Sequence, residues 1–565
     1  MKNQILNIKT LALLVTVLAF GFNTAKAQVD GNFSDRDLSN LTTVLSENNP
    51  EPNVSPVTLD STTLPIVYIY TNFQLIWNEP KITAVMGIIN NGYMQWNHVT
   101  DSFNDYLGYI GIETRGNISQ LYAQKSYGFE TRDSLGNNLD TSLLGMPQDN
   151  DWILYGPYDD RSLMKNVMTF ELARQMGYWA PRTKLVELII NYGFGPDYRG
   201  VYVLMEKIKR DNNRVNIAKL DSNDLAGDSV TGGYILAVDS NFWSGEAGFN
   251  TNPQGLWFSF KYPTDTVLPL QAQYIEMYVD SFEFALAMPN FADLQNGYRK
   301  YCYENTFMDY FFFQEMSKSI DAYKRSNYLF KDKFSKGGKL QNGPLWDYNS
   351  AWGINACTLG ADSGWVYNTY CWPSTSPIPF WYPRMLQDSI YTRDLHCRWI
   401  TWRNSVLDTV NIFNIIDSIA NYLAVPSSRE YTKYNFTENY QNQVDSLKRY
   451  IRKRLVWLDA NMPGNCWNLS VTDNPALEDM FTVYPNPVTD DQGSVTLSFY
   501  LSTEKKLSVT LFNTLGEQVK SFGNENYSSG SNNISLQLGT IPPGMYYIQV
   551  SDGSVTFSKK IVKVN

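Results

Sequence analysis

The sequence predicts an α+β protein, in which a large central region of mixed helices and strands is followed by a small all-β sandwich. In the central region, residues 64–462, apolar runs of strand length are interspersed with longer segments that have a helical period. From Phe481 onwards apolar and polar residues alternate, as in Val495, Leu497 and Phe499. Turn residues recur there roughly every eight to twelve positions, which is typical of a sandwich of about six or seven strands.

The elements of the central region follow from local pattern. Asp160–Met176 is expected to be a helix, because apolar residues recur on one of its faces and a glycine follows it. Leu185–Asn191 and Gly200–Glu206 are expected to pair as two strands around a turn. Thr306–Ser319 is expected to be a helix that enters a polar loop, and Phe436–Met462 a long amphipathic helix.

The N-terminal segment has the features of a secretory signal peptide. Lys2 and Lys9 precede or flank an apolar run from Leu11 to Phe22, and a small-x-small cleavage site follows at Ala25–Ala27. No later segment approaches the length of an apolar membrane span, so we expect no transmembrane segment in the mature chain. The expected organisation is a signal peptide at 1–27, a flexible leader at 28–62, the central domain at 63–467, a linker at 468–480 and the C-terminal domain at 481–565.

Composition excludes several classes of function. The formal net charge of −10 does not attract nucleic acid, so no nucleic-acid partner is expected. The only histidines are His98 and His396, and neither a zinc-ligand spacing, a G-x-S-x-G elbow nor a Walker A loop is present. Five cysteines in an exported chain suggest one or two disulfides, with Cys357–Cys371 the first candidate, and leave an odd thiol.

The first of three motifs that could carry chemistry is the segment that begins at Arg115. Arg115, Gly116, Asn117 and Ser119 form a turn of small and polar residues, and Lys125 follows on a predicted strand. Backbone N–H groups and one fixed cation are the components of a phosphate cradle. The alternative is a hairpin with a surface lysine.

The second motif runs from Asp321 to Asn327. An acid, a short polar loop and an asparagine that opens an aromatic strand can present a carboxylate and an amide to the same metal-bound substrate. The alternative is an ordinary turn with a local side-chain hydrogen bond to the backbone.

The third motif is Trp346–Asn349. Asp347 follows a short apolar strand, which is a suitable position for a Mg²⁺ ligand. The alternative is a strand end with a capping aspartate.

Together these motifs resemble the CotH family of secreted kinase-like proteins. The family pattern contains an R-G-N-x-S element with a downstream lysine, a helix with L-A-R-x-x-G, a G-V-Y-x-x-x-E strand, an aspartate-to-asparagine loop and a W-D-x-D block. In this chain they correspond to Arg115–Ser119 with Lys125, Leu172–Gly177, Gly200–Glu206, Asp321–Asn327 and Trp346–Asn349. The resemblance covers residues 64–462.

The resemblance implies an atypical protein-kinase-like domain that binds ATP and Mg²⁺ (or Mn²⁺) and phosphorylates Ser or Thr of a secreted or surface protein. Lys125 would contact the phosphates beside the Arg115–Ser119 turn, with Glu206 a further candidate for orienting the lysine or the metal. Asp321 would accept the proton of the substrate hydroxyl. Asp347 would hold the metal, with Asn327 and Asn349 as further ligands.

Two departures from the family pattern leave a second function open. The last acid of the W-D-x-D block is Asn349 here, which supplies no charge, and Asp321 lies six positions from Asn327, one more than in ordinary protein kinases. The alternative is a catalytically weak or inactive kinase-like surface protein that binds partners through its many aromatic residues. A glycosidase with an Asp/Glu pair is a more distant alternative, and no pair stands out.

The C-terminal region resembles the type A sorting domain of the bacterial type IX secretion system. The resemblance is carried by YPNP from Tyr484, GMYYIQV from Gly544 and KKIVKV near the end of the chain. It implies an immunoglobulin-like sandwich, handling by the type IX machinery, and a protein that is secreted or anchored at the outer surface of the cell.

Overall fold

The structure is a computed structural model, and the chain divides into two compact units at residue 464. The residues that it describes are 57–239, 246–264, 266–353, 362–368, 378–466, 481–489, 493–501, 504–514, 516–552 and 556–564. The predicted signal peptide, most of the leader, the linker and the pair Cys357–Cys371 lie outside these residues. At the end of the leader, Ser61–Thr62 form β1, which pairs with β4 (Asn97–His98).

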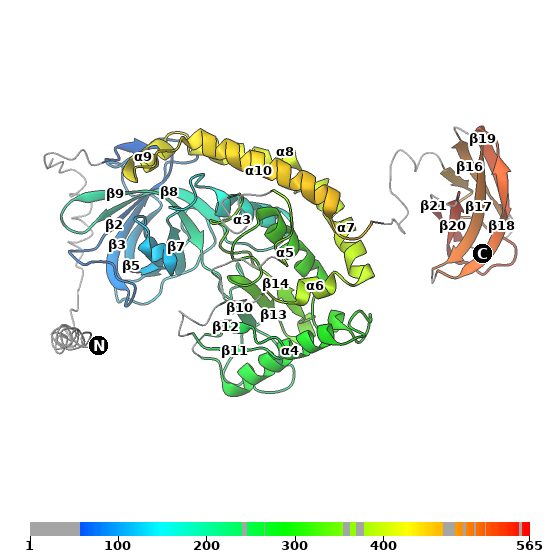
Figure 1. Cartoon of the computed structure of the whole chain (residues 1–565), viewed down its shortest axis with the longest axis horizontal. Helices are drawn as coiled ribbons and strands as arrows, with labels where there is room; N and C mark the ends of the chain where they lie inside the picture. The colour runs from blue at the N-terminus through cyan, green and yellow to red at the C-terminus, as the bar shows by residue number, and fades with distance from the viewer. Residues whose placement is uncertain are drawn as a thin grey trace, which may run out of the picture. The chain divides into compact units, whose positions relative to one another are not determined.

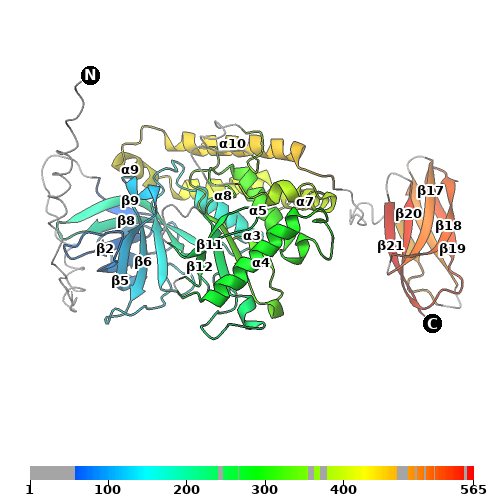
Figure 2. The same cartoon turned by 60° about the horizontal axis from the view of Figure 1, so that its bottom comes forward.

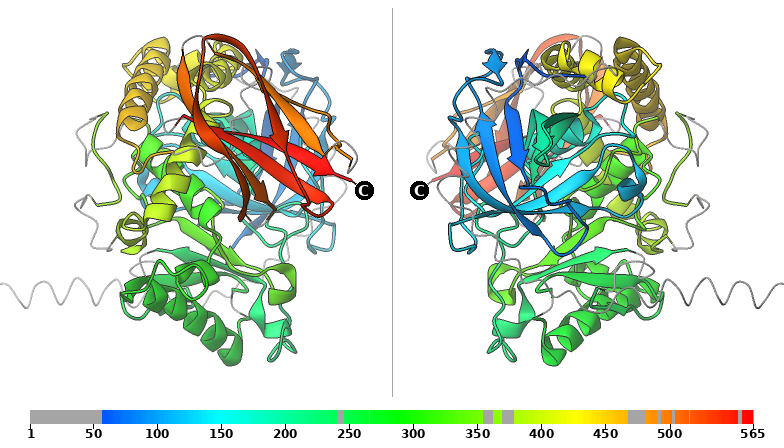
Figure 3. Two further views of the ribbon diagram at one scale, coloured as in Figure 1. Left: turned by 90° about the vertical axis from the view of Figure 1, so that its right-hand side faces the viewer. Right: turned by 90° about the vertical axis from the view of Figure 1, so that its left-hand side faces the viewer.

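A closed seven-stranded barrel forms the first half of the first unit (Figure 1, blue to cyan). Around the barrel the strands are β2 (Ile66–Tyr70), β3 (Ile82–Ile89), β5 (Tyr106–Arg115), β6 (Ser126–Arg132), β7 (Asp151–Tyr155), β9 (Pro196–Glu206) and β8 (Thr183–Asn191). The parallel pairing of β8 with β2 closes it, and every other neighbouring pair is antiparallel. Figure 3 (right) shows the barrel from outside the first unit. Alternate apolar residues such as Val67, Ile69 and Leu188 are buried in its core.

The second half of the first unit is an antiparallel sheet covered by helices. Its strand order is β11 (Gly248–Asn250), β12 (Trp257–Tyr262), β10 (Tyr234–Val238), β13 (Asn327–Lys331) and β14 (Leu340–Asn342). The helices are α3 (Lys165–Gln175), α4 (Pro269–Ala287), α5 (Glu304–Ser317), α6 (Trp381–Met385), α7 (Ser389–Arg403), α8 (Thr409–Tyr422), α9 (Pro426–Lys433) and α10 (Tyr440–Asn461). Short 3₁₀ turns in the first unit lie at Ile118–Leu121, Ser229–Thr231, Tyr298–Lys300 and Phe334–Lys336. Figure 2 shows α10 along the top of this helical layer, and α9 against the barrel.

The strand pair and the helices predicted from the sequence are present, with shifted ends. The pair predicted at 185–206 is β8 and β9. The helix predicted from Asp160 begins at Lys165, because the Asp160 carboxylate accepts hydrogen bonds from the backbone N–H groups of Met164 and Lys165 at 2.9 and 2.8 Å. A carboxylate that satisfies the free N–H groups of a first turn marks a helix start.

A buried ion pair fixes the centre of the helical layer. α5 is buried along almost its whole length, and its Glu315 contacts Arg454 of α10 at 3.3 Å, with both side chains fully buried. Arg454 also donates to the backbone carbonyls of Glu315 and Gly364 at 2.7 and 2.8 Å. The Glu315 carboxylate accepts from the N–H groups of Val366 and Tyr367, each at 2.9 Å. The pair therefore joins two helices and a loop.

The second unit consists of two antiparallel sheets that share one apolar core (Figure 3, left). One sheet has the order β15 (Phe481–Tyr484), β16 (Ser494–Leu501) and β19 (Gly530–Gln537), and the other β18 (Gln518–Tyr527), β17 (Lys505–Asn513), β20 (Gly544–Ser551) and β21 (Thr556–Lys563). Val495, Leu497 and Phe499 are buried on the core face of β16, as the alternation predicts. Helices with sheets in the first unit confirm the α+β class.

Three further observations complete the fold. No helix in the described part of the chain is both long and apolar enough to cross a membrane. Cys397 and Cys466 are disulfide-bonded, and Cys302 is a buried free cysteine. Burial of Cys302 raises the pKa of its thiol, which makes it a poor nucleophile.

Arg454→Met is expected to lower the free energy of unfolding of the first unit by about 3–5 kcal/mol, because it leaves the Glu315 carboxylate buried without its cation. Urea unfolding followed by tryptophan fluorescence measures the change. The control is Lys453→Met, the next residue of α10, whose side chain is 63% exposed and which should cost far less. Equal losses in the two variants would show that the pair is not needed.

Glu430→Gln is expected to flatten the pH dependence of stability. Glu430 of α9 is fully buried against β9 and accepts a hydrogen bond from the Val201 N–H at 2.7 Å. Burial raises the pKa of this carboxyl to about 8, so the folded state holds a proton that the unfolded state releases at a lower pH. Stability therefore falls as pH rises towards 8.

Melting temperatures of the wild type and Glu430→Gln at pH 5, 7 and 9 measure this effect. The amide side chain can still accept from Val201 but cannot ionise, so the difference between the two proteins should grow with pH in favour of the variant. A difference independent of pH would contradict the expectation. Glu438→Gln removes a more exposed carboxylate nearby and serves as control.

Candidate functional site

The loop that carries Asp347 is held in place by one face of α3. Lys165 Nζ donates to the carbonyl of Ala351 at 2.6 Å, and Asn166 Oδ1 accepts from the Tyr348 N–H at 2.7 Å. One turn further on, Thr169 Oγ1 accepts from Trp352 Nε1 at 2.9 Å. All three α3 side chains are buried. This explains why polar residues occupy a buried helix face: they satisfy two backbone groups and one indole N–H of the loop.

The loop that carries Asp321 follows α5 directly. Tyr323 Oη donates to the Glu315 carboxylate at 2.9 Å, which connects the loop to the buried ion pair. Tyr323, Ser326 and Asp347 all have positive φ, between 48° and 68°. Non-glycine residues in this region are strained and tend to gather at functional sites. Ser326 Oγ donates to Asp347 Oδ2 at 3.3 Å and so joins the two loops.

The two predicted carboxylates belong to one electrostatic cluster. Burial, together with the negative charges of Asp321 and Asp159, raises the pKa of Asp347 to about 7, although the hydrogen bond from Ser326 and the charge of Arg115 act in the opposite direction. The pKa of Asp321 is also raised by burial, which Arg325 and Lys324 partly offset. Buried acids that perturb one another in this way are typical of functional sites.

Two amides predicted as metal ligands carry unsatisfied oxygens. Asn327 Nδ2 donates to the Tyr323 carbonyl at 3.0 Å, and Asn349 Nδ2 donates to Asp159 Oδ2 at 2.6 Å. These donor bonds fix which atom of each amide is the nitrogen. The remaining oxygen of each amide is buried and has no hydrogen-bond partner among the described residues. An amide oxygen in that state suits a hard cation.

Asp159 is the member of the site that sequence reasoning missed. It lies just after β7, and its Oδ2 also accepts from Ser350 Oγ at 2.8 Å. It thus places a carboxylate against Asn349, the position where the W-D-x-D block lacks its second acid. Two consecutive acids at 159 and 160, a few residues after an apolar strand, were the available signal, but Asn349 lies 190 residues further along the chain.

The predicted phosphate loop reaches this cluster through Arg115. The Arg115 guanidinium lies 5.6 Å from the centre of the Trp346 ring, next to Asp347, and the charges of Arg115 and Asp347 interact. Gly116 has a φ of 103°, and a Cβ there would lie 1.9 Å from Ser119 Oγ, so glycine is required. Asn117 is exposed and Ser119 is half-buried. The turn is therefore a tight loop beside the acids.

Lys125 and Glu206 have other partners in this structure. Lys125 Nζ donates to the Gln120 carbonyl within its own loop. Glu206 is fully buried, and its two carboxylate oxygens accept from the Arg182 guanidinium and backbone N–H, each at 2.8 Å. Arg214 lies 3.9 Å from the same carboxylate. A role for Glu206 in orienting Lys125 or the metal stays a prediction, without a supporting contact among the described residues.

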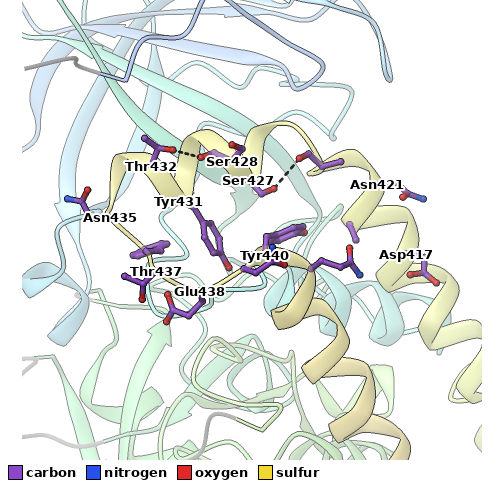
Figure 4. Close-up of a pocket in the computed structure, with 15 residues that line it drawn as sticks. Asp417, Asn421, Ser427, Ser428, Tyr431, Thr432, Asn435, Thr437, Glu438 and Tyr440 are labelled. Carbon is purple, nitrogen blue, oxygen red and sulfur yellow. Dashed lines mark hydrogen bonds between the residues drawn. The ribbon is translucent and has the colours of Figure 1, made fainter.

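The site is not a ready-made cluster of charged metal ligands. Within the described residues, no three Asp, Glu, His or Cys side chains converge closely enough to hold a metal ion by themselves. The donor set instead mixes carboxylates with the amides of Asn327 and Asn349. A cavity of about 860 Å³ lies elsewhere, between α8, α9 and the start of α10, and includes none of the predicted site residues (Figure 4).

The fold and the site define a two-unit α+β protein whose first unit brings an acid–amide cluster next to a tight glycine turn. The family model described as CotH kinase protein matches residues 112–458, which is more than half of the chain, and the chain belongs to this family. The model of the secretion system C-terminal sorting domain matches residues 482–564, so the second unit is a type IX sorting domain.

Other comparisons add little. No curated protein matches the chain. Among solved structures, a similarity covers 17% of this chain and 13% of PorZ, a surface component of the type IX secretion system of Porphyromonas gingivalis, at 16% identity and a TM-score of 0.13. The DNA glycosylase AlkC of Pseudomonas fluorescens is matched over 35% of this chain and 56% of its own, at 14% identity and a TM-score of 0.11. Neither similarity bears on the fold.

Asn349→Asp is expected to make stability depend on divalent cations. Without a cation, the new carboxylate faces Asp159 and loses the 2.6 Å hydrogen bond, which should cost about 1.5–3 kcal/mol. With Mn²⁺ or Mg²⁺, the added charge should strengthen binding, so the cation-induced rise in melting temperature should exceed that of the wild type. Thermal melts in EDTA and in millimolar Mn²⁺ measure both effects. Asn290→Asp, at an exposed position, should respond like the wild type.

Proposed function

We propose that the protein is an exported protein kinase of the CotH type, which transfers the γ-phosphate of ATP to Ser or Thr of an extracytoplasmic protein. The observation that supports this best is the pair of unsatisfied amide oxygens, on Asn327 and Asn349, beside the acids of the same two loops. Burying an unpaired acceptor costs free energy unless a ligand satisfies it. The family and the sorting domain agree with this proposal.

In the proposed reaction Asp321 is the base. Its carboxylate accepts the proton of the substrate hydroxyl as that oxygen attacks the γ-phosphorus of ATP. The bond between the γ-phosphorus and the bridging oxygen breaks, and ADP leaves with the electron pair of that bond. Asp321 suits this role because it is half-buried and its pKa is already raised, so that it can hold a proton.

The residues present fit a divalent cation. Asp347, Asn327 and Asn349 would hold it, with Asp159 adding the negative charge that Asn349 lacks. The cation supplies charge neutralisation of the phosphates during transfer. Phosphoryl transfer needs mainly positioning and electrostatic stabilisation. The hydrogen bonds from α3 to the Asp347 loop would contribute to the positioning.

The turn at Arg115–Ser119 would contact the phosphates. Its backbone N–H groups would be the donors; Gly116 permits the tight turn, and Arg115 lies near Asp347. Lys125 would leave the Gln120 carbonyl and pair with a phosphate, a stronger, charge-assisted contact.

Where the protein works follows from its second unit. The type IX sorting domain is an export address, and we propose that a signal peptide at 1–27 directs the first step of export. The substrate would then be a secreted or surface protein.

Incubation of the chain from residue 28 with ATP and Mg²⁺ or Mn²⁺, followed by intact mass measurement, tests the proposal. We expect added units of about 80 Da, one phosphate each, on the chain itself or on a co-purified surface protein. Asp321→Ala and Asp347→Ala should reduce incorporation at least a hundredfold, because each removes a charge from the transfer step.

The melting temperature in the presence of ATP and Mg²⁺ distinguishes a kinase from a surface binding protein. If no mass is added and ATP with Mg²⁺ does not raise the melting temperature, the kinase proposal fails, and a kinase-like surface binding protein becomes the better description. Asp417→Ala, which changes an exposed acid of the cavity in Figure 4, is the matched control and should retain incorporation.

A further inference from the structure

We propose that a cavity next to the candidate site binds a small, uncharged, planar ring compound that offers one hydrogen-bond donor and one acceptor. This cavity, called here the back cavity, has a volume of about 310 Å³ and lies between the end of α3, the segment after β9, α5, and the strands β13 and β14. It is distinct from the acid–amide cluster, and nothing in the proposed kinase reaction uses it.

Two buried polar atoms of residues that line the back cavity are unsatisfied. Asn342 is 5% exposed, and its Nδ2 donates to Tyr382 Oη at 2.8 Å. Its Oδ1 and the indole Nε1 of Trp179 are both buried without a hydrogen-bond partner among the described residues. One is an acceptor and the other a donor. A ligand with a matching donor and acceptor would satisfy both.

The remaining walls favour a flat, apolar ligand. The rings of Tyr178, Tyr310, Phe313 and Phe330 line the cavity. Aromatic walls of this kind pack best against planar ligands. The volume is at the lower end of the range usual for small-molecule sites, about 300–1,000 Å³.

The charged residues of the back cavity are already neutralised. Asp309 Oδ1 accepts from Arg398 and Trp402 at 2.7 and 2.8 Å. Arg214 donates to the carbonyls of Lys207 and Asp151 at 2.9 and 2.8 Å, and lies 3.3 Å from Asp149. No charge is left to pair with the ligand, so the ligand is uncharged.

The back cavity shares its walls with the loops of the candidate site. Its residues Gly343–Leu345 lead directly into Trp346 and Asp347. Ala173, on the opposite wall, belongs to α3, which holds that loop through three hydrogen bonds. Burial raises the pKa of the lining residue Tyr310, and the negative charge of Asp321 nearby also raises it. A ligand here should therefore influence both acids.

Calorimetric titration of the chain from residue 28 with 7-azaindole tests the proposal. This compound is planar and uncharged, with an N–H donor beside a ring-nitrogen acceptor. We expect saturable one-site binding to the wild type and at least tenfold weaker binding of indole, which lacks the ring acceptor. Absence of binding, or equal affinity for the two compounds, would overturn the proposal.

Variants of lining residues test whether 7-azaindole binds in the back cavity. Asn342→Leu and Trp179→Phe should each weaken 7-azaindole binding at least tenfold, and Asn421→Leu, in the cavity of Figure 4, should leave it unchanged. Each variant is first checked for a cooperative melt, and Trp179→Phe carries the test if Asn342→Leu does not fold. Unchanged affinity in a folded Trp179→Phe would overturn the assignment.

Competition separates the back cavity from a nucleotide site. The titration is repeated in the presence of saturating ATP and Mg²⁺. We expect 7-azaindole still to bind, with an affinity that ATP alters but does not abolish. Competitive displacement by ATP would overturn the proposal of a separate site without contradicting the kinase proposal, and failure of the kinase test leaves this titration unaffected.

Discussion

The buried ion pair between Glu315 and Arg454 is the contact on which the helical part of the first unit depends. Two full charges out of water are tolerated only when hydrogen bonds satisfy the rest of each group, and here backbone N–H and carbonyl groups of the 362–367 loop do so. The same Glu315 carboxylate accepts from Tyr323, in the loop that carries Asp321. A structural ion pair therefore also sets the position of the proposed base.

The candidate site combines two loops that are supported from different sides. The Asp321 loop is held by α5, and the Asp347 loop by the polar face of α3. Ser326 connects them, and burial together with the nearby carboxylates of Asp321 and Asp159 raises the pKa of Asp347 to about 7. Buried acids that raise one another's pKa have an electrostatic cost, which a bound cation would reduce.

Asn349 departs from the family pattern, and its contacts show which residue supplies the missing negative charge. In the sequence, Asn349 stands where the family pattern has the second acid of the W-D-x-D block. In the structure its amide nitrogen contacts Asp159, which restores a negative charge beside it, and its oxygen is left free to accept. Glu206 shows the opposite case: a motif residue whose carboxylate is already occupied by Arg182.

The sequence by itself determined the α+β class, the strand pair β8 and β9, the long helices and the three motifs. The reason is that the spacing of apolar residues along a segment indicates which face of a helix or strand is buried. The sequence also determined Asp321, Asn327 and Asp347 as candidates, since Asp321 follows a predicted helix, Asn327 opens a predicted strand and Asp347 follows a short apolar run. Only the tertiary structure decided the closure of the barrel by β2 and β8 and the contact of Asp159 with Asn349. Both join segments more than a hundred residues apart, and a local pattern shows that a face is covered without showing which distant segment covers it.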